Sequence, residues 1–298
     1  MCHVTSMVNR WAGLVASTAV LLVLISSAGC GGGSSSQSTS GAPAAIPTNG
    51  LTHYWTADNV FADAPGTADG ASGGTVAFAP GISGQAFKFN GVEQFVDISD
   101  IVAMSPHADT DRMSVGGWFF IDPNAAGNDG DLSMLVSKSN GNTVGGGWFL
   151  AFDDRGIPVG YPPGYSPPFI NTIWFGAANT NGVYGGTGVM ARKDNAITTA
   201  GWYHVMVIFD PSATPEAVLF INGAAAANSG VEHIPYITAN GLSGRIGAAH
   251  TNEYGGADND RFNGMADEIR YYNRALALSE VKIIFNAGAS AAGLPAIP

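Results

Sequence analysis

Residues 262–285 constrain the fold of this chain more than any other stretch, because a strand pattern is followed there by a short helix pattern. Side chains of a strand alternate between its two faces. The face predicted to point toward the core is formed by Met265, Asp267, Ile269 and Tyr271. On the opposite face, Glu268 and Arg270 can form an ion pair in water. Asp267 is the exception on its own face, since a carboxylate among apolar neighbours needs a cation or hydrogen-bond donors.

The predicted helix begins with Ser279 as its N-cap and ends near Gly288. Val281, Ile284 and Phe285 repeat at the spacing of one helix face, so we expect them to be buried. This strand and helix indicate a type of module but do not identify a ligand.

Two Asn-Gly pairs mark tight turns elsewhere in the chain, because both residue types accept a positive φ. Asn222-Gly223 ends a predicted hairpin, and Asn90-Gly91 is predicted to join two short strands. The clearest predicted strands are residues 113–121, 133–138, 147–152, 173–177, 203–209 and 217–221. With 41 glycines, 16 prolines and 12% charged residues, the composition also favours many short strands joined by turns.

Several segments, taken in order, resemble the laminin-G-like jelly roll of the concanavalin A-like lectin/glucanase superfamily. The matching segments are Trp55-x-x-Asp58, GQAFKFNG at 84–91, residues 114–118, WYHV at 202–205, FING at 220–223 and DEIRYYNRAL at 267–276. The resemblance covers roughly residues 50–288. It implies an all-β fold, a two-sheet antiparallel jelly-roll sandwich with one short C-terminal helix.

The N-terminus is predicted to be a lipoprotein signal peptide over residues 1–29. An apolar run at 14–25 has the length of a signal-peptide core and is too short to span a bilayer. It ends in Ser27-Ala28-Gly29-Cys30, which resembles a bacterial lipoprotein processing site. That resemblance implies cleavage before Cys30 and acylation of this cysteine, which would anchor the protein in a membrane.

The residues after the cysteine fit a tether. Residues 30–49 are predicted to be the lipidated cysteine and a flexible Gly/Ser/Ala linker, residues 50–288 the jelly-roll domain and residues 289–298 a tail. By resemblance, Gly31 after the cysteine points to the outer membrane of a bacterial cell envelope. The alternative is an ordinary secretion signal with a coincidental cysteine. Cys2 is the only other cysteine and lies in the removed segment, which weighs against a disulfide at Cys30.

The net charge narrows the range of partners. The chain has 12 basic and 23 acidic residues, giving a formal charge of −11. Without a Lys/Arg cluster, such a domain is unsuited to nucleic acid or anionic lipid as a partner.

A calcium site is predicted where the first and last strands meet. Asp58 follows the first strand and Asp267 lies in the last, and in the resembled fold these strands lie close together. Many members of that fold bind a structural calcium there, and calcium takes six to eight oxygen ligands. Asn59, Asp63 and loop carbonyls could complete the shell. The alternative is that backbone N–H groups or an arginine satisfy the aspartates.

A sugar site is predicted on aromatic side chains, because aromatic rings stack on the apolar faces of pyranose rings. Tyr161 and Tyr165 lie in a proline-rich segment, residues 155–175, and Trp174 lies at its end. The alternative is that these rings cover the core or pack at the edge of the sandwich.

Catalysis is not predicted. Retaining glycosidases need two carboxylates about 5 Å apart. Those of the resembled superfamily place them alternately on one strand, as Glu-x-Asp-x(-x)-Glu, and no such pattern occurs here. Asp153-Asp154 and Asp267-Glu268 are adjacent pairs whose members point to opposite faces.

We therefore expect a membrane-anchored, extracytoplasmic, lectin-like module that binds a glycan or polysaccharide without catalysis. The alternatives are a structural or adhesive module that binds envelope or extracellular proteins, or a polysaccharide-degrading hydrolase or lyase. The fold alone permits all three.

Overall fold

The protein is described by a computed structural model. The described residues are 44–98, 104, 111–125, 128, 132–139, 146–154, 170–178, 188–230, 233–234, 236–237, 241–250 and 260–298. Residues 43–298 fall into one compact unit. Within the described ranges, no helix has the length and hydropathy needed to cross a bilayer.

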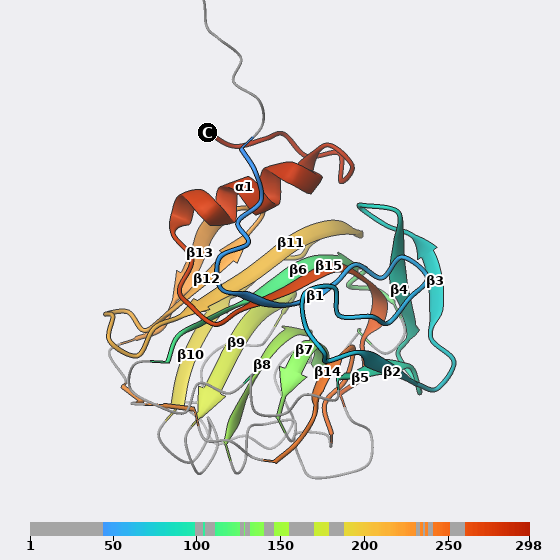
Figure 1. The fold of residues 1–298 in the computed structure, drawn as a ribbon, viewed down its shortest axis with the longest axis horizontal. Helices are drawn as coiled ribbons and strands as arrows, with labels where there is room; N and C mark the ends of the chain where they lie inside the picture. Colours follow the sequence, from blue (N-terminus) through green and yellow to red (C-terminus); the bar gives the residue numbers. More distant parts are fainter. Residues whose placement is uncertain are drawn as a thin grey trace, which may run out of the picture. The chain divides into compact units, whose positions relative to one another are not determined.

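The strands form two antiparallel sheets packed as layers (Figure 1). In spatial order the first sheet comprises β13 (Ala224–Asn228), β12 (Ala217–Ile221), β11 (Gly201–Phe209), β6 (Met113–Ile121), β15 (Asn263–Tyr272), β4 (Gln85–Asn90) and β3 (Ala77–Pro80), and β1 (Leu51–Trp55) also pairs with β15. The second comprises β10 (Gly188–Lys193), β9 (Thr172–Ala178), β8 (Gly147–Asp153), β7 (Leu132–Lys138), β14 (Gly244–Ile246), β5 (Phe95–Ile98) and β2 (Gly70–Gly73).

The main core lies between the two sheets. Phe119 of β6 and Val205 of β11 contribute from the first sheet, and Trp148 of β8 and Phe175 of β9 contribute from the second. All four are at most 1% exposed. The predicted all-β jelly-roll sandwich is therefore confirmed, as is the predicted meeting of the first and last strands, because β1 pairs with β15.

The two Asn-Gly turns differ in what they join. Asn222 and Gly223 have φ of 50° and 73° and join β12 to β13 in one hairpin, as predicted. Gly91 also has a positive φ, but β4 and β5 belong to different sheets. The Asn90-Gly91 turn therefore carries the chain from one sheet to the other. Its stability comes from Asn90 Oδ1, which accepts backbone hydrogen bonds from residues 92–94.

Helix α1 (Leu278–Ala289) covers the outer face of the first sheet (Figure 1). Val281, Ile284 and Phe285 are buried, as predicted. The N-cap is Ala277, and the prediction of Ser279 was wrong. The helix begins earlier because Glu280 accepts a hydrogen bond from the Ala277 N–H at 2.8 Å.

A β-bulge in β15 overturns the predicted assignment of faces on this strand. Its pairing with β6 shifts between Asp267 and Arg270, and Glu268 has φ of 56°. An extra residue in a bulge resets the alternation of side chains. As a result Ala266, with Ile269 and Tyr271, faces the sandwich core. Asp267 is fully buried outside that core.

Candidate functional site

Two aspartates hold the turn between β3 and β4 from opposite ends. Asp58 Oδ1 accepts a hydrogen bond from the Gln85 N–H at 2.8 Å. Asp267 Oδ2 accepts two, from the N–H groups of Ile82 at 2.7 Å and Ser83 at 3.0 Å. The structure therefore brings the two predicted metal ligands to the same segment, residues 81–85, where backbone N–H groups are their partners.

Asp267 is the more buried of the two. Its side chain has no exposed surface, and burial raises the pKa of its carboxyl to about 7, although the N–H groups of Ser83 and Ile82 oppose this rise. Its Oδ1 atom is buried and makes no hydrogen bond of good geometry. Near neutral pH this carboxyl is therefore divided between its acid and its ionised form.

The other two predicted metal ligands do not join this turn. Asp63 accepts hydrogen bonds from the N–H groups of Tyr54 and Ala68, and its Oδ2 lies 2.7 Å from His53 Nδ1. Asn59 lies on an exposed turn with φ of 59°. Among the residues that the structure describes, no three His, Cys, Asp or Glu side chains are grouped to hold a metal. The described side chains thus supply only part of a calcium shell, and calcium stays a prediction.

Gly84 gives this turn its shape, and its replacement is a test of the contact. The residue has φ of 66°, and a Cβ added there would lie 2.0 Å from Asp58 Oδ1. We expect Gly84→Ala to lower the free energy of unfolding by about 1–2 kcal/mol, through left-handed backbone strain and loss of the Asp58 contact. The control is Gly230→Ala, because nothing lies within 4 Å of a Cβ at Gly230. Equal unfolding midpoints in urea for the two variants would contradict this account of the turn.

A charged network continues from the turn to the space beneath α1. Arg270 Nη2 donates to Glu268 Oε2 at 2.5 Å, and the Tyr54 hydroxyl donates to Glu268 at 2.7 Å. The Arg270 guanidinium also lies 4.2 Å from the centre of the Tyr54 ring. The predicted ion pair is present, but it is buried, with 8% of Glu268 and 3% of Arg270 exposed. Both residues line a cavity of about 190 Å³ with Trp118 and Ile284.

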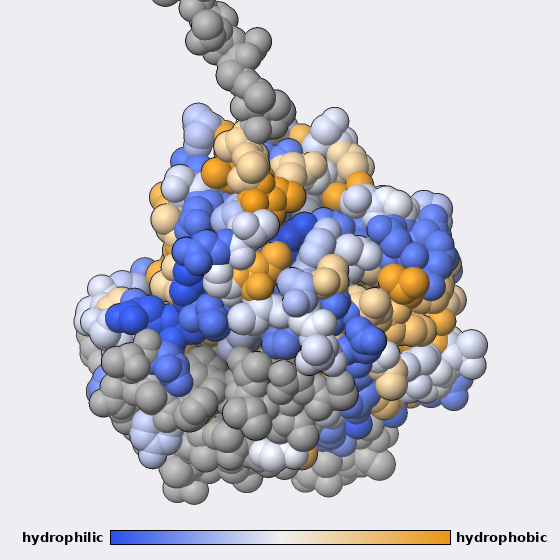
Figure 2. Space-filling model, viewed as in Figure 1, coloured by the Kyte–Doolittle hydropathy of each residue, from blue (hydrophilic) through white to orange (hydrophobic). Residues whose placement is uncertain are grey.

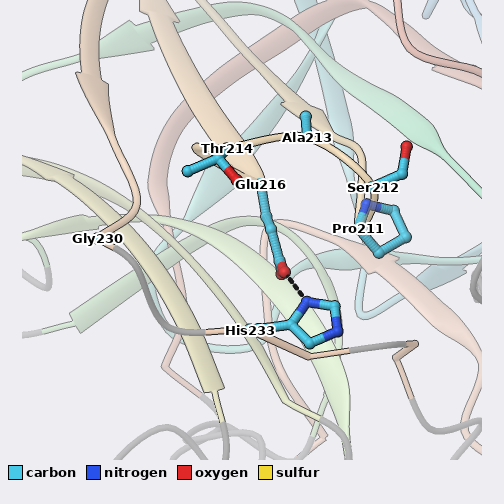
Figure 3. Close-up of a pocket in the computed structure, with 7 residues that line it drawn as sticks. All are labelled: Pro211, Ser212, Ala213, Thr214, Glu216, Gly230 and His233. Carbon is cyan, nitrogen blue, oxygen red and sulfur yellow. Dashed lines mark hydrogen bonds and ion pairs between the residues drawn. The ribbon is translucent and has the colours of Figure 1, made fainter.

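A second cavity, of about 270 Å³, lies at the end of the β11–β12 hairpin (Figure 3). Glu216 and His233 point toward each other across it, and His233 Nδ1 contacts Glu216 Oε1. Glu216 is 5% exposed and also accepts from the Ile234 N–H at 3.2 Å, whereas 62% of the His233 side chain is exposed.

The second cavity is suited to binding polar groups. The carboxylate of Glu216 orients the His233 ring, and in Figure 3 the second ring nitrogen points away from Glu216. Ser212 lines the same cavity, but its hydroxyl is bound to Asp210 at 2.6 Å and points away from His233 in Figure 3. This is not the geometry of a hydroxyl nucleophile activated by a histidine, in which the two side chains are hydrogen-bonded. Imidazole and backbone groups around a hollow of this size can instead bind the hydroxyl groups of a ligand.

The predicted sugar-binding aromatics are placed differently. Trp174 lies in β9 with no exposed surface, and its ring meets that of Phe149 edge-on at 4.5 Å. In this position it presents no face to solvent for stacking on a sugar. Tyr161 and Tyr165 lie outside the described residues, as does Cys30, so their roles stay predictions.

Glu216 and His233 were missed by sequence reasoning. They are 17 residues apart, and neither belongs to a motif with fixed spacing. Only the folding of loop 210–216 against residues 233–234 brings them together. The Thr214-Pro215 pair was a signal for a turn at this point, but not for a site.

This architecture is a two-sheet antiparallel jelly-roll sandwich with one helix. Residues 91–282, more than half of the chain, match the laminin-G family model described as the concanavalin A-like lectin/glucanases superfamily. The chain belongs to this superfamily. No curated protein sequence matches the chain.

Solved structures with a similar fold include binding domains of a mosquitocidal protein and of botulinum neurotoxins. The binding domain of Paraclostridial mosquitocidal protein 1 is 14% identical with a TM-score of 0.58, over 83% of this chain and 55% of that one. The binding domain of botulinum neurotoxin DC in complex with SialylT is 14% identical (TM-score 0.54, 82% and 52% coverage). The same domain in complex with rat synaptotagmin II is 13% identical (TM-score 0.53, 80% and 52%). The chain spans about half the length of these domains, and the likeness shows the fold alone.

Proposed function

We propose that this chain is a non-catalytic glycan-binding module, held in a bacterial cell envelope, at the outer membrane, by a lipid on Cys30. The observation that supports the proposal most strongly is the hydrogen bonding of the acidic side chains that were candidates for metal binding or catalysis in the sequence. Asp58 and Asp267 hold a turn, Asp63 holds β1, and Glu268 is bound by Arg270 and Tyr54. Carboxylates that are hydrogen-bonded in this way to backbone N–H groups, to an arginine and to a tyrosine stabilise the fold.

The similar toxin domains support a binding role with two classes of partner. The binding domain of botulinum neurotoxin DC is described in complex with SialylT and in complex with rat synaptotagmin II, a glycan and a protein. For this chain a glycan is the better-supported ligand. Its acidic charge and the polar cavity at Glu216 and His233 suit neutral hydroxylated ligands. Tyr161 and Tyr165 are proposed as a stacking surface.

A glycan array with residues 43–298 tests the proposal. We expect saturable retention of at least one glycan class, and at least a tenfold loss of affinity (about 1.4 kcal/mol) for His233→Ala or for Tyr161→Ala combined with Tyr165→Ala. Val92→Ala is the control, because Val92 is 72% exposed on the β4–β5 turn. That turn lies toward the other edge of the sheets from the β11–β12 hairpin.

The array also separates the alternatives. A domain that ignores every glycan but retains an envelope protein would establish the structural or adhesive function instead. Release of reducing ends or unsaturated products from a bound polysaccharide would establish a hydrolase or lyase. Loss of binding in Val92→Ala equal to that in His233→Ala would show that the cavity is not the site.

A further inference from the structure

The chain joins the compact unit beside α1. The Tyr272 hydroxyl donates to the Pro47 carbonyl at 2.9 Å, and Arg274 Nε donates to the Asn49 carbonyl at 2.7 Å. Ile46 packs against the apolar cluster that also holds Val281 and Ile284 of α1. Residues 44–50 therefore lie along the α1 side of the first sheet, and in Figure 1 they run down past the helix.

An apolar groove lies on the same side. It has a volume of about 370 Å³, and its lining includes Leu278 and Ile283 of α1 and Ile297 and Pro298 of the C-terminal segment. Leu278, the first residue of α1, is 49% exposed. Figure 2 shows apolar residues gathered among polar ones at this end of the molecule.

The charge of this side differs from that of the whole chain. Between residues 274 and 298 the charged side chains are Arg274, Glu280 and Lys282, whereas acids outnumber bases 23 to 12 overall. Glu280 is also paired with Arg274 at 2.6 Å. With two basic side chains and one acidic side chain, this segment is not repelled by anionic headgroups, although the molecule as a whole is acidic.

The length of the segment before residue 44 limits how far this side can lie from an anchor at Cys30. For a Gly/Ser-rich segment of about 13 residues, the root-mean-square end-to-end distance is about 20 Å. The radius of gyration expected for a domain of this size is about 18 Å, so the tether is shorter than the domain is wide. With a lipid anchor at Cys30 and the predicted flexible linker, the side that carries residue 44 would be the side held nearest the membrane.

We infer that the α1 side, with its groove, rests on the phospholipid surface that holds the anchor. This inference depends on the proposed lipid at Cys30. The Asn222-Gly223 turn packs beside Phe285 and Ile297 on the α1 side. The cavity at Glu216 and His233 is at the other end of the five-residue strand β12, about 17 Å away. The contact thus holds the proposed glycan site off the membrane and open to ligands.

Fluorescent labels on single cysteines test the orientation in the acylated full chain. Ser279→Cys places a label on the exposed start of α1, and Ala213→Cys places one beside the cavity. The protein is reconstituted in vesicles of phosphatidylethanolamine with a minority of phosphatidylglycerol that carry nitroxide-labelled lipids. We expect quenching at position 279 to be at least threefold stronger than at position 213. Adding Leu278→Glu and Ile297→Glu should bring the two values together while the protein stays in the membrane fraction.

Three results would contradict this inference or the lipid anchor at Cys30 on which it depends. Equal quenching at the two positions, or stronger quenching at 213, would overturn the orientation. Protection of the 279 label in detergent without vesicles, in a dimer, would assign the groove to a second copy of the chain and also overturn it. If Cys30→Ser leaves membrane association unchanged, the lipid anchor itself is refuted, which is a separate failure.

Discussion

Arg270→Ala is expected to lower the free energy of unfolding by about 3–5 kcal/mol, the largest effect that we expect of any single substitution here. Arg270 is 3% exposed, and its guanidinium donates to the Glu268 side chain and to the Glu268 carbonyl. Its removal leaves the buried Glu268 carboxylate with the Tyr54 hydroxyl as its side-chain hydrogen-bond donor among the residues that the structure describes. An uncompensated buried charge is costly because water cannot reach it. Urea unfolding followed by tryptophan fluorescence measures the loss.

Two controls show whether burial of the pair is the cause. In Glu268→Gln with Arg270→Met both charges are removed, and stability should return to within about 1 kcal/mol of the wild type. Arg112 pairs with Asp210 at the surface, with 37% of its side chain exposed, so Arg112→Ala should cost less than about 1 kcal/mol. Equal losses for Arg270→Ala and Arg112→Ala would refute the buried-charge explanation.

Asp267→Ala is expected to cost about 1.5–3 kcal/mol, because the N–H groups of Ile82 and Ser83 lose a charged acceptor. Asp267→Asn keeps an acceptor oxygen and should cost clearly less. Comparing the two variants by thermal unfolding separates the effect of losing the hydrogen-bond acceptor from the effect of losing the charge. If Asp267→Ala were as stable as the wild type, the turn would not depend on this side chain.

The Asp267 carboxyl also predicts that the stability of the folded protein falls as the pH rises. Burial raises its pKa from 3.8 in the unfolded chain to about 7 in the folded protein, so the folded state favours the acid form. The stability that this provides is fully present below about pH 4 and is lost as the pH rises through about 7. Relative to Asp267→Asn, the wild type should therefore lose stability between these pH values. A rise over this range would contradict the raised pKa.

Calcium at Asp58 and Asp267 would lower the pKa of the Asp267 carboxyl, which is the opposite of the effect of burial, because a cation stabilises the ionised form. At about pH 8, added calcium would raise the melting midpoint of the wild type by mass action, and EGTA would reverse the rise. Asp267→Asn would respond less. An unchanged midpoint would leave the N–H groups of the turn as the partners of both aspartates.

The fold was predictable because its signals are local and repeated. Residues 113–121 and 217–221 alternate or run apolar as strands do, and both form strands with the predicted bounds. The buried stripe of α1 followed from helix periodicity in the same way. The ends of elements were less predictable. The start of α1 depends on the contact between Glu280 and the Ala277 N–H, which no periodicity encodes.

The site was less predictable because it depends on tertiary contacts. The bulge at Glu268 moves Asp267 off the core face, and a period-two pattern cannot show a one-residue insertion. The approach of Asp58 and Asp267 to one turn was foreseen only through the resemblance to a known fold. The contact of Glu216 with His233 joins two loops, and nothing in either loop's sequence indicates the other.

The most direct test of the central claim is affinity chromatography of residues 43–298 on immobilised polysaccharides, with the size of the polysaccharide measured before and after. A binding module should be retained on at least one polysaccharide, elute with the free sugar as competitor and leave the polymer intact. Shortening of the polymer, or passage through every column without retention, would contradict the claim.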